Sequence, residues 1–194
     1  MVDGATEQYW SRPNGLAPNS RYPLLVHRSA VPGGGEDKVI ARFRENGWLN
    51  NWRYPGVYTY RHFHSTTHEC LGVARGWMDV EIFGEGGTML RVTAGDVIVL
   101  PAGVSHMMVA HSDDVSMTGG YPDGRDWDNM RQDDLSEPLR REAAKRIMML
   151  PIPARDPATG SPMLHWIDAP SSVDANLNAF RDGLESHRPE SWAN

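Results

Sequence analysis

Between Gly56 and Tyr121 the sequence is a succession of short runs of strand-forming residues, each ended by residues that favour turns. Glu85-Gly86-Gly87 separates two of these runs, and glycines in such a place are typical of a β-hairpin. Short strands joined by tight turns predict a β-barrel or a double-sheet jelly roll rather than a fold of long helices. The expected strands are Val57–His64, Glu69–Arg75, Trp77–Phe83, Thr88–Val92, Asp96–Leu100, His106–Ala110 and Val115–Thr118.

Apolar residues at helical spacing predict a few peripheral helices outside this region. In Glu36–Gly47, the side chains of Val39, Ile40 and Phe43 share one face, so we expect a short helix there. Two more helices are expected at Glu137–Met149, with the stripe Leu139, Ala143 and Ile147, and at Ser172–Leu184, with the stripe Leu177, Phe180 and Leu184.

These elements predict one all-β domain over residues 1–194, with a barrel core at about 54–121. The N-terminal segment 1–53, with an edge strand at Tyr22–Val26, is expected to pack on the barrel. The helical C-terminal extension 122–194, with a charged loop at Asp123–Asp134, is expected to do the same. A chain of 194 residues of which 40% are hydrophobic suits one domain with a sizeable core.

Charge and composition argue against several classes of partner. The formal net charge is −6 with basic residues scattered among acidic ones, so we expect no nucleic-acid partner. No stretch approaches the roughly 18 apolar residues of a membrane span, and the start has no signal-peptide pattern. Cys70 is the only cysteine, which excludes an internal disulfide and indicates a reducing compartment. We therefore expect a cytoplasmic protein without a membrane partner.

Three histidines and one glutamate form the candidate metal site. His62 and His64 are two residues apart, so on a strand their side chains point to the same face. Glu69 follows a turn and opens the next strand, where its carboxylate can meet the imidazoles across the pair. His106 begins a later strand after a Pro/Gly turn. Such a donor set suits one divalent metal ion, with Fe, Mn, Ni, Co and Zn all left open.

These two segments resemble the two conserved motifs of the cupin superfamily. The motif G(X)5HXH(X)3–4E(X)6G is met by Gly56, His62, His64, Glu69 and Gly76, and G(X)5PXG(X)2H(X)3N by Gly95, Pro101, Gly103 and His106. Ala110 stands where the second motif ends in Asn, a position that is not a metal ligand in the family.

The resemblance implies a cupin jelly-roll, or double-stranded β-helix, barrel that holds a metal ion through His62, His64, Glu69 and His106. The chain is similar to a group of small bacterial single-domain cupins of mostly unassigned activity. Family habit also implies a homodimer.

His68 neighbours Glu69 and competes with it as a ligand. Neighbours on a strand point to opposite faces, and the six-residue gap to Gly76 selects Glu69. We therefore expect His68 on the barrel rim or in a dimer contact. Arg75 is expected at a solvated strand end, and Cys70 is expected to be a small core residue.

Other side chains of the barrel are candidates for contact with a substrate. Tyr58 and Tyr60 share the inward face of His62, where packing is the simpler interpretation; Tyr60 and Glu69 are nevertheless the candidate catalytic residues. The cavity is expected to be largely apolar, lined by Met78, Val80, Ile82 and Met108.

A metal-dependent enzyme acting on a small organic molecule, of the dioxygenase type, is the leading hypothesis. Cupins carry out hydrolysis, isomerisation and oxygenation, so the fold and the metal ligands do not identify which of these reactions a given cupin catalyses. A metal-dependent isomerase or epimerase, a non-catalytic module that binds a small ligand or a metal, and a purely structural metal site are the alternatives.

Overall fold

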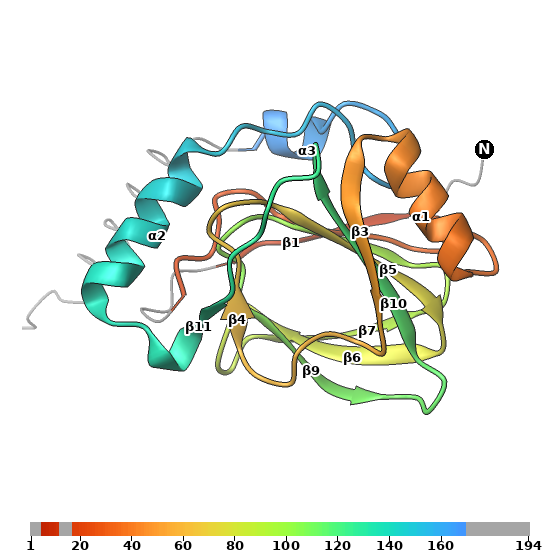
Figure 1. The fold of residues 1–194 in the computed structure, drawn as a ribbon, viewed down its shortest axis with the longest axis horizontal. Coiled ribbons are helices and arrows are strands. Elements are labelled where there is room, and N and C mark those ends of the chain that lie inside the picture. Colours follow the sequence, from red (N-terminus) through yellow and green to blue (C-terminus); the bar gives the residue numbers. More distant parts are fainter. Residues whose placement is uncertain (1–4, 12–16, 170–194) are drawn as a thin grey trace, which may run out of the picture.

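The computed structural model describes residues 5–11 and 17–169, which form two antiparallel β-sheets and a few helices (Figure 1). The six-stranded sheet has the order β1 (Thr6–Tyr9), β2 (Leu24–His27), β8 (Val97–Leu100), β5 (Glu69–Arg75), β10 (Ser116–Pro122) and β3 (Trp48–Tyr54). The five-stranded sheet has the order β11 (Met130–Arg131), β4 (His62–Phe63), β9 (His106–His111), β6 (Trp77–Ile82) and β7 (Thr88–Thr93). The helices are α1 (Glu36–Glu45), α2 (Glu137–Met149) and α3 (Leu164–Ile167), and a 3-10 turn spans Gln132–Asp134. This arrangement confirms the expected jelly roll.

The main core lies between the two sheets. Along β6 the side chains alternate, so that Met78, Val80 and Ile82 are buried while their neighbours in sequence are partly exposed. Leu71 and Val73 of β5 belong to the same buried cluster from the opposite sheet. The two sheets therefore bury one apolar face each, which is what drives a jelly roll to close.

A second apolar layer covers the outer face of the six-stranded sheet. Helix α1 contacts β3, β5 and β10 and buries Val39, Ile40 and Phe43, the stripe expected from the sequence (Figure 1). The approach is close because β5 has Gly72 at this point, where a Cβ atom would collide with Val39. Cys70 also lies fully buried in this layer, as expected.

Several elements differ from the expected ones. The strand expected at Val57–His64 is reduced to β4, because residues 57–61 form an irregular crossing whose Tyr58 carbonyl accepts the Met108 amide. The loop expected at Asp123–Asp134 contains the short strand β11, which pairs with β4. Strands β1 and β3 were not expected; both are sheet edges, β1 with mostly half-buried and β3 with mostly exposed side chains, so neither has a clear apolar pattern.

Helix α2 spans Glu137–Met149 as expected, but its apolar stripe is only partly used. Ala143 is fully buried in a cluster with Phe63, and Ile147 packs against that cluster, whereas Leu139 of the same stripe is 52% exposed. The helix touches the sandwich near one turn only, which leaves its two ends in solvent. The helix expected at Ser172–Leu184 lies outside the described residues.

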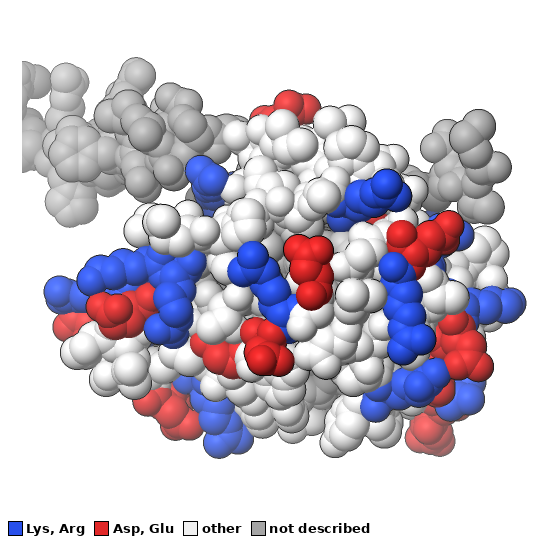
Figure 2. All heavy atoms as spheres, turned by 45° about the horizontal axis from the view of Figure 1, so that its top comes forward, with Lys and Arg blue, Asp and Glu red and all other residues white. Residues whose placement is uncertain are grey.

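The surface carries mixed charge. Basic and acidic side chains are interspersed over the face shown in Figure 2. Ion pairs on the protein include Arg53 with Asp37 and Arg61 with Glu81. Arg75 lies exposed at the end of β5, as expected, and its guanidinium meets Glu36. Of the helices in the described ranges, none combines the length and the apolar character needed to cross a membrane.

A buried polar clamp ties the N-terminal strands to the segment after α2. His27 of β2 places Nε2 2.8 Å from Asp156 Oδ2 and Nδ1 3.0 Å from the hydroxyl of Thr6. The Asp156 carboxylate also accepts the backbone N–H groups of Ala158 and Thr159. Burial alone would raise the pKa of Asp156, but the hydrogen bond from His27 and the two amides outweigh it and lower the pKa.

Asp156→Asn is expected to lower the free energy of unfolding by about 2 kcal/mol, because hydrogen bonds to a buried charge are lost. The folded pKa lies below the unfolded value of about 3.9, so the stabilisation is complete above that value and is lost as pH falls through the folded pKa. Urea titrations of both proteins should therefore differ by a constant amount at neutral pH and converge below about pH 4. Asp113→Asn, at an exposed aspartate, is the control and should change nothing. Equal stability of the Asp156 variant and wild type at pH 7 would contradict the clamp.

Candidate metal centre

Three buried histidines converge on one point inside the sandwich. His62 of β4 lies directly opposite His106 of β9 in the sheet, and His64 follows two residues after His62. Ligand nitrogens of the three rings all lie within 4.8 Å of one another. The three residues are between 2% and 5% exposed. The strand pairing, and not the spacing in sequence, therefore brings His106 to the other two.

Each of the three rings is oriented by a backbone carbonyl. Nδ1 of His62 donates to the Tyr60 carbonyl at 3.1 Å, and Nδ1 of His106 donates to the Val104 carbonyl at 3.1 Å. Nδ1 of His64 donates to the carbonyl of Asp128. A carbonyl can only accept, so the proton is fixed on Nδ1 and the lone pair of each Nε2 faces the shared point. This is the tautomer that a metal-binding histidine needs.

Burial and the neighbouring imidazoles favour the neutral form of His62. Burial, followed by the proximity of His106 and His64, lowers the pKa of His62 to about 2. His106 Nε2 is fully buried and has no hydrogen-bond partner. A buried nitrogen lone pair without a partner is costly, and a bound cation would remove that cost.

Glu69 brings a carboxylate to the same point from the other sheet. It is the first residue of β5, and its Oε2 lies 3.3 Å from His64 Nε2 and 3.5 Å from His106 Nε2. Burial opposes ionisation of Glu69, but the adjacent imidazoles of His64 and His106 lower its pKa, so it is a carboxylate. The carboxylate in turn raises the pKa of His64 against the effect of burial. The negative charge at this point is a further feature that suits a cation.

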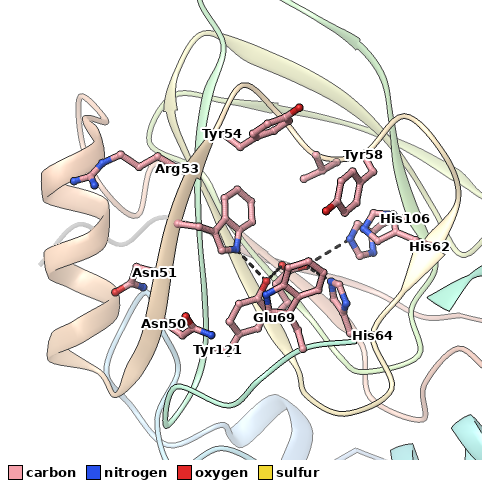
Figure 3. Close-up of a pocket in the computed structure, with 13 residues that line it drawn as sticks. Asn50, Asn51, Arg53, Tyr54, Tyr58, His62, His64, Glu69, His106 and Tyr121 are labelled. Carbon is pink, nitrogen blue, oxygen red and sulfur yellow. Dashed lines mark hydrogen bonds and ion pairs between the residues drawn. The ribbon is translucent and has the colours of Figure 1, made fainter. Parts of the chain in front are cut away.

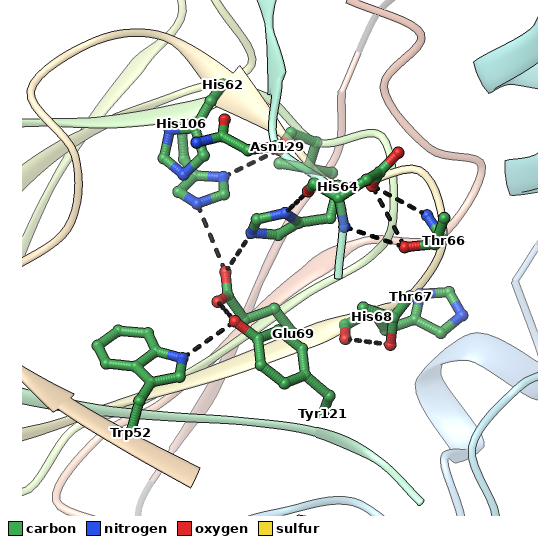
Figure 4. A network of polar contacts seen from close by, with 12 residues as sticks. Trp52, His62, His64, Thr66, Thr67, His68, Glu69, His106, Tyr121 and Asn129 are labelled. Atoms are coloured by element: carbon green, nitrogen blue, oxygen red, sulfur yellow. Dashed lines mark hydrogen bonds and ion pairs between the residues drawn. The ribbon is translucent and has the colours of Figure 1, made fainter. Parts of the chain in front are cut away.

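The other carboxylate oxygen is held by a chain of two aromatic side chains (Figure 4). The Tyr121 hydroxyl of β10 lies 3.0 Å from Glu69 Oε1, and the Trp52 indole N–H of β3 donates to the same hydroxyl at 3.0 Å. Because the indole can only donate and the carboxylate can only accept, Tyr121 must donate to Glu69. Tyr121 thereby leaves Oε2 as the oxygen that faces the histidines.

The donor set fits a divalent metal ion. Three neutral imidazoles and one carboxylate are ligands for Fe, Mn, Ni, Co or Zn, and the oriented Nδ1–H bonds are the outer support that such sites require. The buried three-histidine cluster is therefore of the metal-binding kind, as the sequence predicted. Glu69 as the fourth ligand stays a prediction that its position suits.

Asp128 is a residue that the sequence gave no reason to single out. Its backbone carbonyl orients His64, while its carboxylate accepts the amides of Ser65 and Thr66 and the Ser65 hydroxyl. Arg146 of α2 reaches the same Ser65 hydroxyl. The segment around Asp128 is thus tied to the turn after His64, 62 to 64 residues away in sequence, and no local motif marks such a contact.

His68 points away from the cluster, as expected because neighbouring side chains on a strand point to opposite faces. The prediction that it lies on the barrel rim was wrong. It is 4% exposed, its Nδ1 accepts the Ala102 amide at 2.9 Å, and its ring packs against Trp166 of α3. Burial lowers the pKa of His68 to about 4, so it is a neutral core residue. The segment after α2 covers this side of the sheet. The alternation of side chains along a strand does not predict which distant segment will pack there.

A cavity of about 310 Å³ opens above the histidines (Figure 3). The residues that line it are Asn50, Asn51, Trp52, Arg53, Tyr54, Val57, Tyr58, His62, His64, Glu69, His106, Tyr121 and Trp127. Met78, Val80, Ile82 and Met108 were expected to line the cavity; they instead fill the core between the sheets, below the histidines, because the cavity opens toward β3.

The two tyrosines before His62 have different places. Tyr58 lines the cavity and packs edge-on against His62. Tyr60 stacks on Tyr58, carries Arg131 over its ring, and accepts a hydrogen bond from Asn129. Tyr60 is outside the set of lining residues, so its catalytic role stays a prediction without a contact that favours it.

The chain can be compared with known proteins. It is 35% identical over 171 residues to the uncharacterized protein YjlB of Bacillus subtilis (strain 168), an alignment that covers 86% of this chain and 99% of YjlB. No family model matches the chain.

Two solved structures show weaker similarity. The TDP-quinovose 3,4-ketoisomerase WlaRB of Campylobacter jejuni has a TM-score of 0.36 and 13% identity, covering 47% of this chain and 74% of that one. The oxalate decarboxylase of Bacillus subtilis, described with Mn(II) centres, has a TM-score of 0.37 and 17% identity, covering 62% of this chain and 32% of that one. TM-scores of this size carry no argument about this chain, whereas the nearly complete alignment with YjlB does.

Metal analysis tests the histidine cluster directly. Untagged wild-type protein is expected to hold about one divalent metal ion per chain, and His62→Ala is expected to lose it, because a ligand nitrogen is removed. His111→Ala, at an exposed histidine of β9, is the control and should keep the metal. Equal metal content in all three proteins after reconstitution would place the metal elsewhere.

Tyr121→Phe tests whether the outer hydrogen bond matters to the metal. Removing the hydroxyl frees Glu69 Oε1, and loss of such support typically lowers metal affinity roughly 10- to 100-fold. Competition with a chromophoric chelator measures this affinity. Tyr54→Phe, at a lining tyrosine that has no hydrogen bond to Glu69, is the matched control. An unchanged affinity in Tyr121→Phe would show that Glu69 needs no such support.

Proposed function

Since this chain belongs to the family of the Bacillus subtilis protein YjlB and has the cupin fold, we propose that it is a metal-dependent oxidoreductase of the dioxygenase type acting on a small organic molecule. One observation carries the proposal: the three histidines and Glu69 lie at the floor of a cavity with mainly aromatic walls. A redox metal with four protein ligands has positions left for further ligands and supplies Lewis acidity and one-electron chemistry.

The residues of the chain supply position rather than proton transfer. His62, His64 and His106 would hold a metal ion through Nε2, each ring being fixed by its carbonyl, and the Glu69 carboxylate would lower the net charge of the centre. Trp127 packs edge-on against His64, with ring centroids 5.5 Å apart, and forms part of the cavity wall beside the centre. A substrate in this cavity lies next to the candidate ligands.

The lack of an evident general base in the cavity wall favours oxidoreduction over isomerisation. Apart from the four candidate ligands, the described lining residues include no carboxylate and no histidine. Burial, and then the charge of Glu69, raise the pKa of the Tyr121 hydroxyl far above its usual value, so it stays protonated. An isomerase or epimerase would need a group that takes a proton from carbon near neutral pH, and this wall offers none outside the ligands.

A metal substitution series with an oxygen electrode tests the proposed function. Protein loaded with Fe(II) or Mn(II) is expected to consume O₂ in the presence of its substrate, and protein loaded with Zn(II) is expected not to, since Zn(II) has no redox chemistry. Small organic molecules are screened in pools, and His106→Ala should lose at least 100-fold of any uptake found, through loss of the metal.

Turnover that is equally fast with Zn(II) would assign hydrolysis or isomerisation instead. The absence of any O₂ uptake with every redox metal, over the full screen, would overturn the proposal and leave a binding module or a structural metal site.

A further inference from the structure

One short segment, residues 128–132, lies outside both cupin motifs and yet borders the histidines of the metal centre. At its start, the backbone carbonyl of Asp128 accepts the Nδ1–H of His64. The segment then forms strand β11, in which Arg131 lies opposite His62. The orientation of one candidate ligand and the backbone pairing of another therefore depend on where this segment lies.

The same segment also reaches the third histidine. Gln132 is 1% exposed, and its Oε1 accepts the hydroxyl of Ser105, the residue before His106, at 2.7 Å. The Gln132 amide donates to the carbonyl of Arg61, the residue before His62, at 3.0 Å. A displacement of this segment would thus be transmitted to the neighbours of all three candidate ligands.

The carboxylate of Asp128 ties this segment to the turn after His64. Its Oδ1 lies 2.6 Å from the amide nitrogen of Ser65 and 3.2 Å from that of Thr66, and its Oδ2 accepts the Ser65 hydroxyl. Hydrogen bonds to a carboxylate are roughly twice as strong as those between neutral groups. Since Ser65 directly follows His64, these bonds fix the Asp128 carbonyl in place relative to the ring that it orients.

Helix α2 braces the same turn from outside the sandwich. Nε and Nη2 of Arg146 donate to the hydroxyl oxygen of Ser65 at 3.0 and 2.8 Å, and Nη2 lies 3.6 Å from Asp128 Oδ2. Because a guanidinium can only donate, the Ser65 hydroxyl gives its own proton to Asp128. One turn earlier in the helix, Ala143 is buried in a cluster with Phe63, which lies between two of the histidines.

We propose that Asp128 and Arg146 are positioning residues of the metal centre, which set its affinity for the metal by holding the ring of His64. Neither belongs to the donor set, so each acts through another residue. Helix α2, which carries no part of either cupin motif, is thereby a working part of the centre. The inference rests on the metal-binding part of the proposed function and is independent of the reaction.

Competition with a chromophoric chelator for Zn(II), on untagged protein, measures the effect of Asp128. Asp128→Ala keeps the backbone carbonyl but removes every bond of the carboxylate to the turn. It is expected to weaken Zn(II) binding roughly 10- to 100-fold, as loss of the outer hydrogen bonds of a metal site typically does. The visible spectrum of the Co(II)-loaded variant is expected to differ from that of wild type, because the geometry of the donors changes.

Arg146→Met tests the contribution of helix α2. It keeps the apolar stem of the side chain and removes the donors, so Zn(II) binding is expected to weaken about fivefold, as for one hydrogen-bonding group. Arg146 acts through the bonds of Asp128, so the double variant is expected to bind Zn(II) no more weakly than Asp128→Ala alone. The side chain of Arg146 is 44% exposed, so this variant decides the question even if Asp128→Ala fails to fold.

Asp156→Asn is the matched control for a purely structural role. Its carboxylate also accepts two backbone amides, but it lies outside the donor set and the cavity wall. This variant is expected to lose stability and to keep the Zn(II) affinity and the Co(II) spectrum of wild type. All affinities are measured below the onset of unfolding, which circular dichroism records for each variant.

The possible outcomes separate this inference from the proposed function. Unchanged Zn(II) affinity in Asp128→Ala and Arg146→Met, or an equal loss in Asp156→Asn, would overturn the inference and leave the proposed function standing. A loss confined to the first two variants, without O₂ uptake with any redox metal, would support the inference and overturn the proposed function. A wild-type protein that takes up no metal would overturn both.

Discussion

The convergence of three imidazole lone pairs on one buried point is the constraint on which the rest of this structure depends. Each ring is fixed because its Nδ1–H donates to a backbone carbonyl, so each Nε2 must face inward. His106 Nε2 accepts no hydrogen bond there, and the Glu69 carboxylate reaches the same point from the opposite sheet, 3.5 Å away. Such an arrangement is costly in an apolar sandwich without a cation. The two sheets therefore meet at this point through polar groups that a bound cation would stabilise together.

Residues around the cluster hold its side chains in place through hydrogen bonds. The Asp128 segment holds His64 and is tied to the turn at Ser65 and to Arg146 of α2. On the other side, Trp52 and Tyr121 fix the orientation of the Glu69 carboxylate. The same aromatic residues, Trp52 and Tyr121, line the cavity. The side chains that hold the Glu69 carboxylate in place are therefore also part of the cavity wall.

Local sequence patterns predicted the elements whose apolar residues are regularly spaced. Helix α1 packs with the expected stripe, and β6 alternates between buried and partly exposed residues. These patterns did not predict the elements whose side chains are mostly exposed or whose backbone follows an irregular path. Strand β3 is a sheet edge with mostly exposed side chains, and residues 57–61 cross between sheets without pairing in a ladder. The rim position expected for His68 failed for another reason, since α3 and its Trp166 cover that face from almost 100 residues away.

The sequence by itself determined the donor atoms: His62 and His64 share a face because strand side chains alternate, and the motif spacing selects Glu69 over His68. It also determined the jelly-roll class, since short alternating runs between turns leave few other ways to bury their apolar faces. Only the tertiary structure decided which carbonyls orient the rings, that Tyr121 and Trp52 hold Glu69, and that Trp127 packs edge-on against His64. The Tyr60 and Val104 carbonyls lie two residues before the rings that they orient, whereas the other hydrogen bonds join residues 52 to 69 positions apart through sheet pairing and the path of loops. Local periodicity records which face a side chain occupies, but not which distant residue will meet it there.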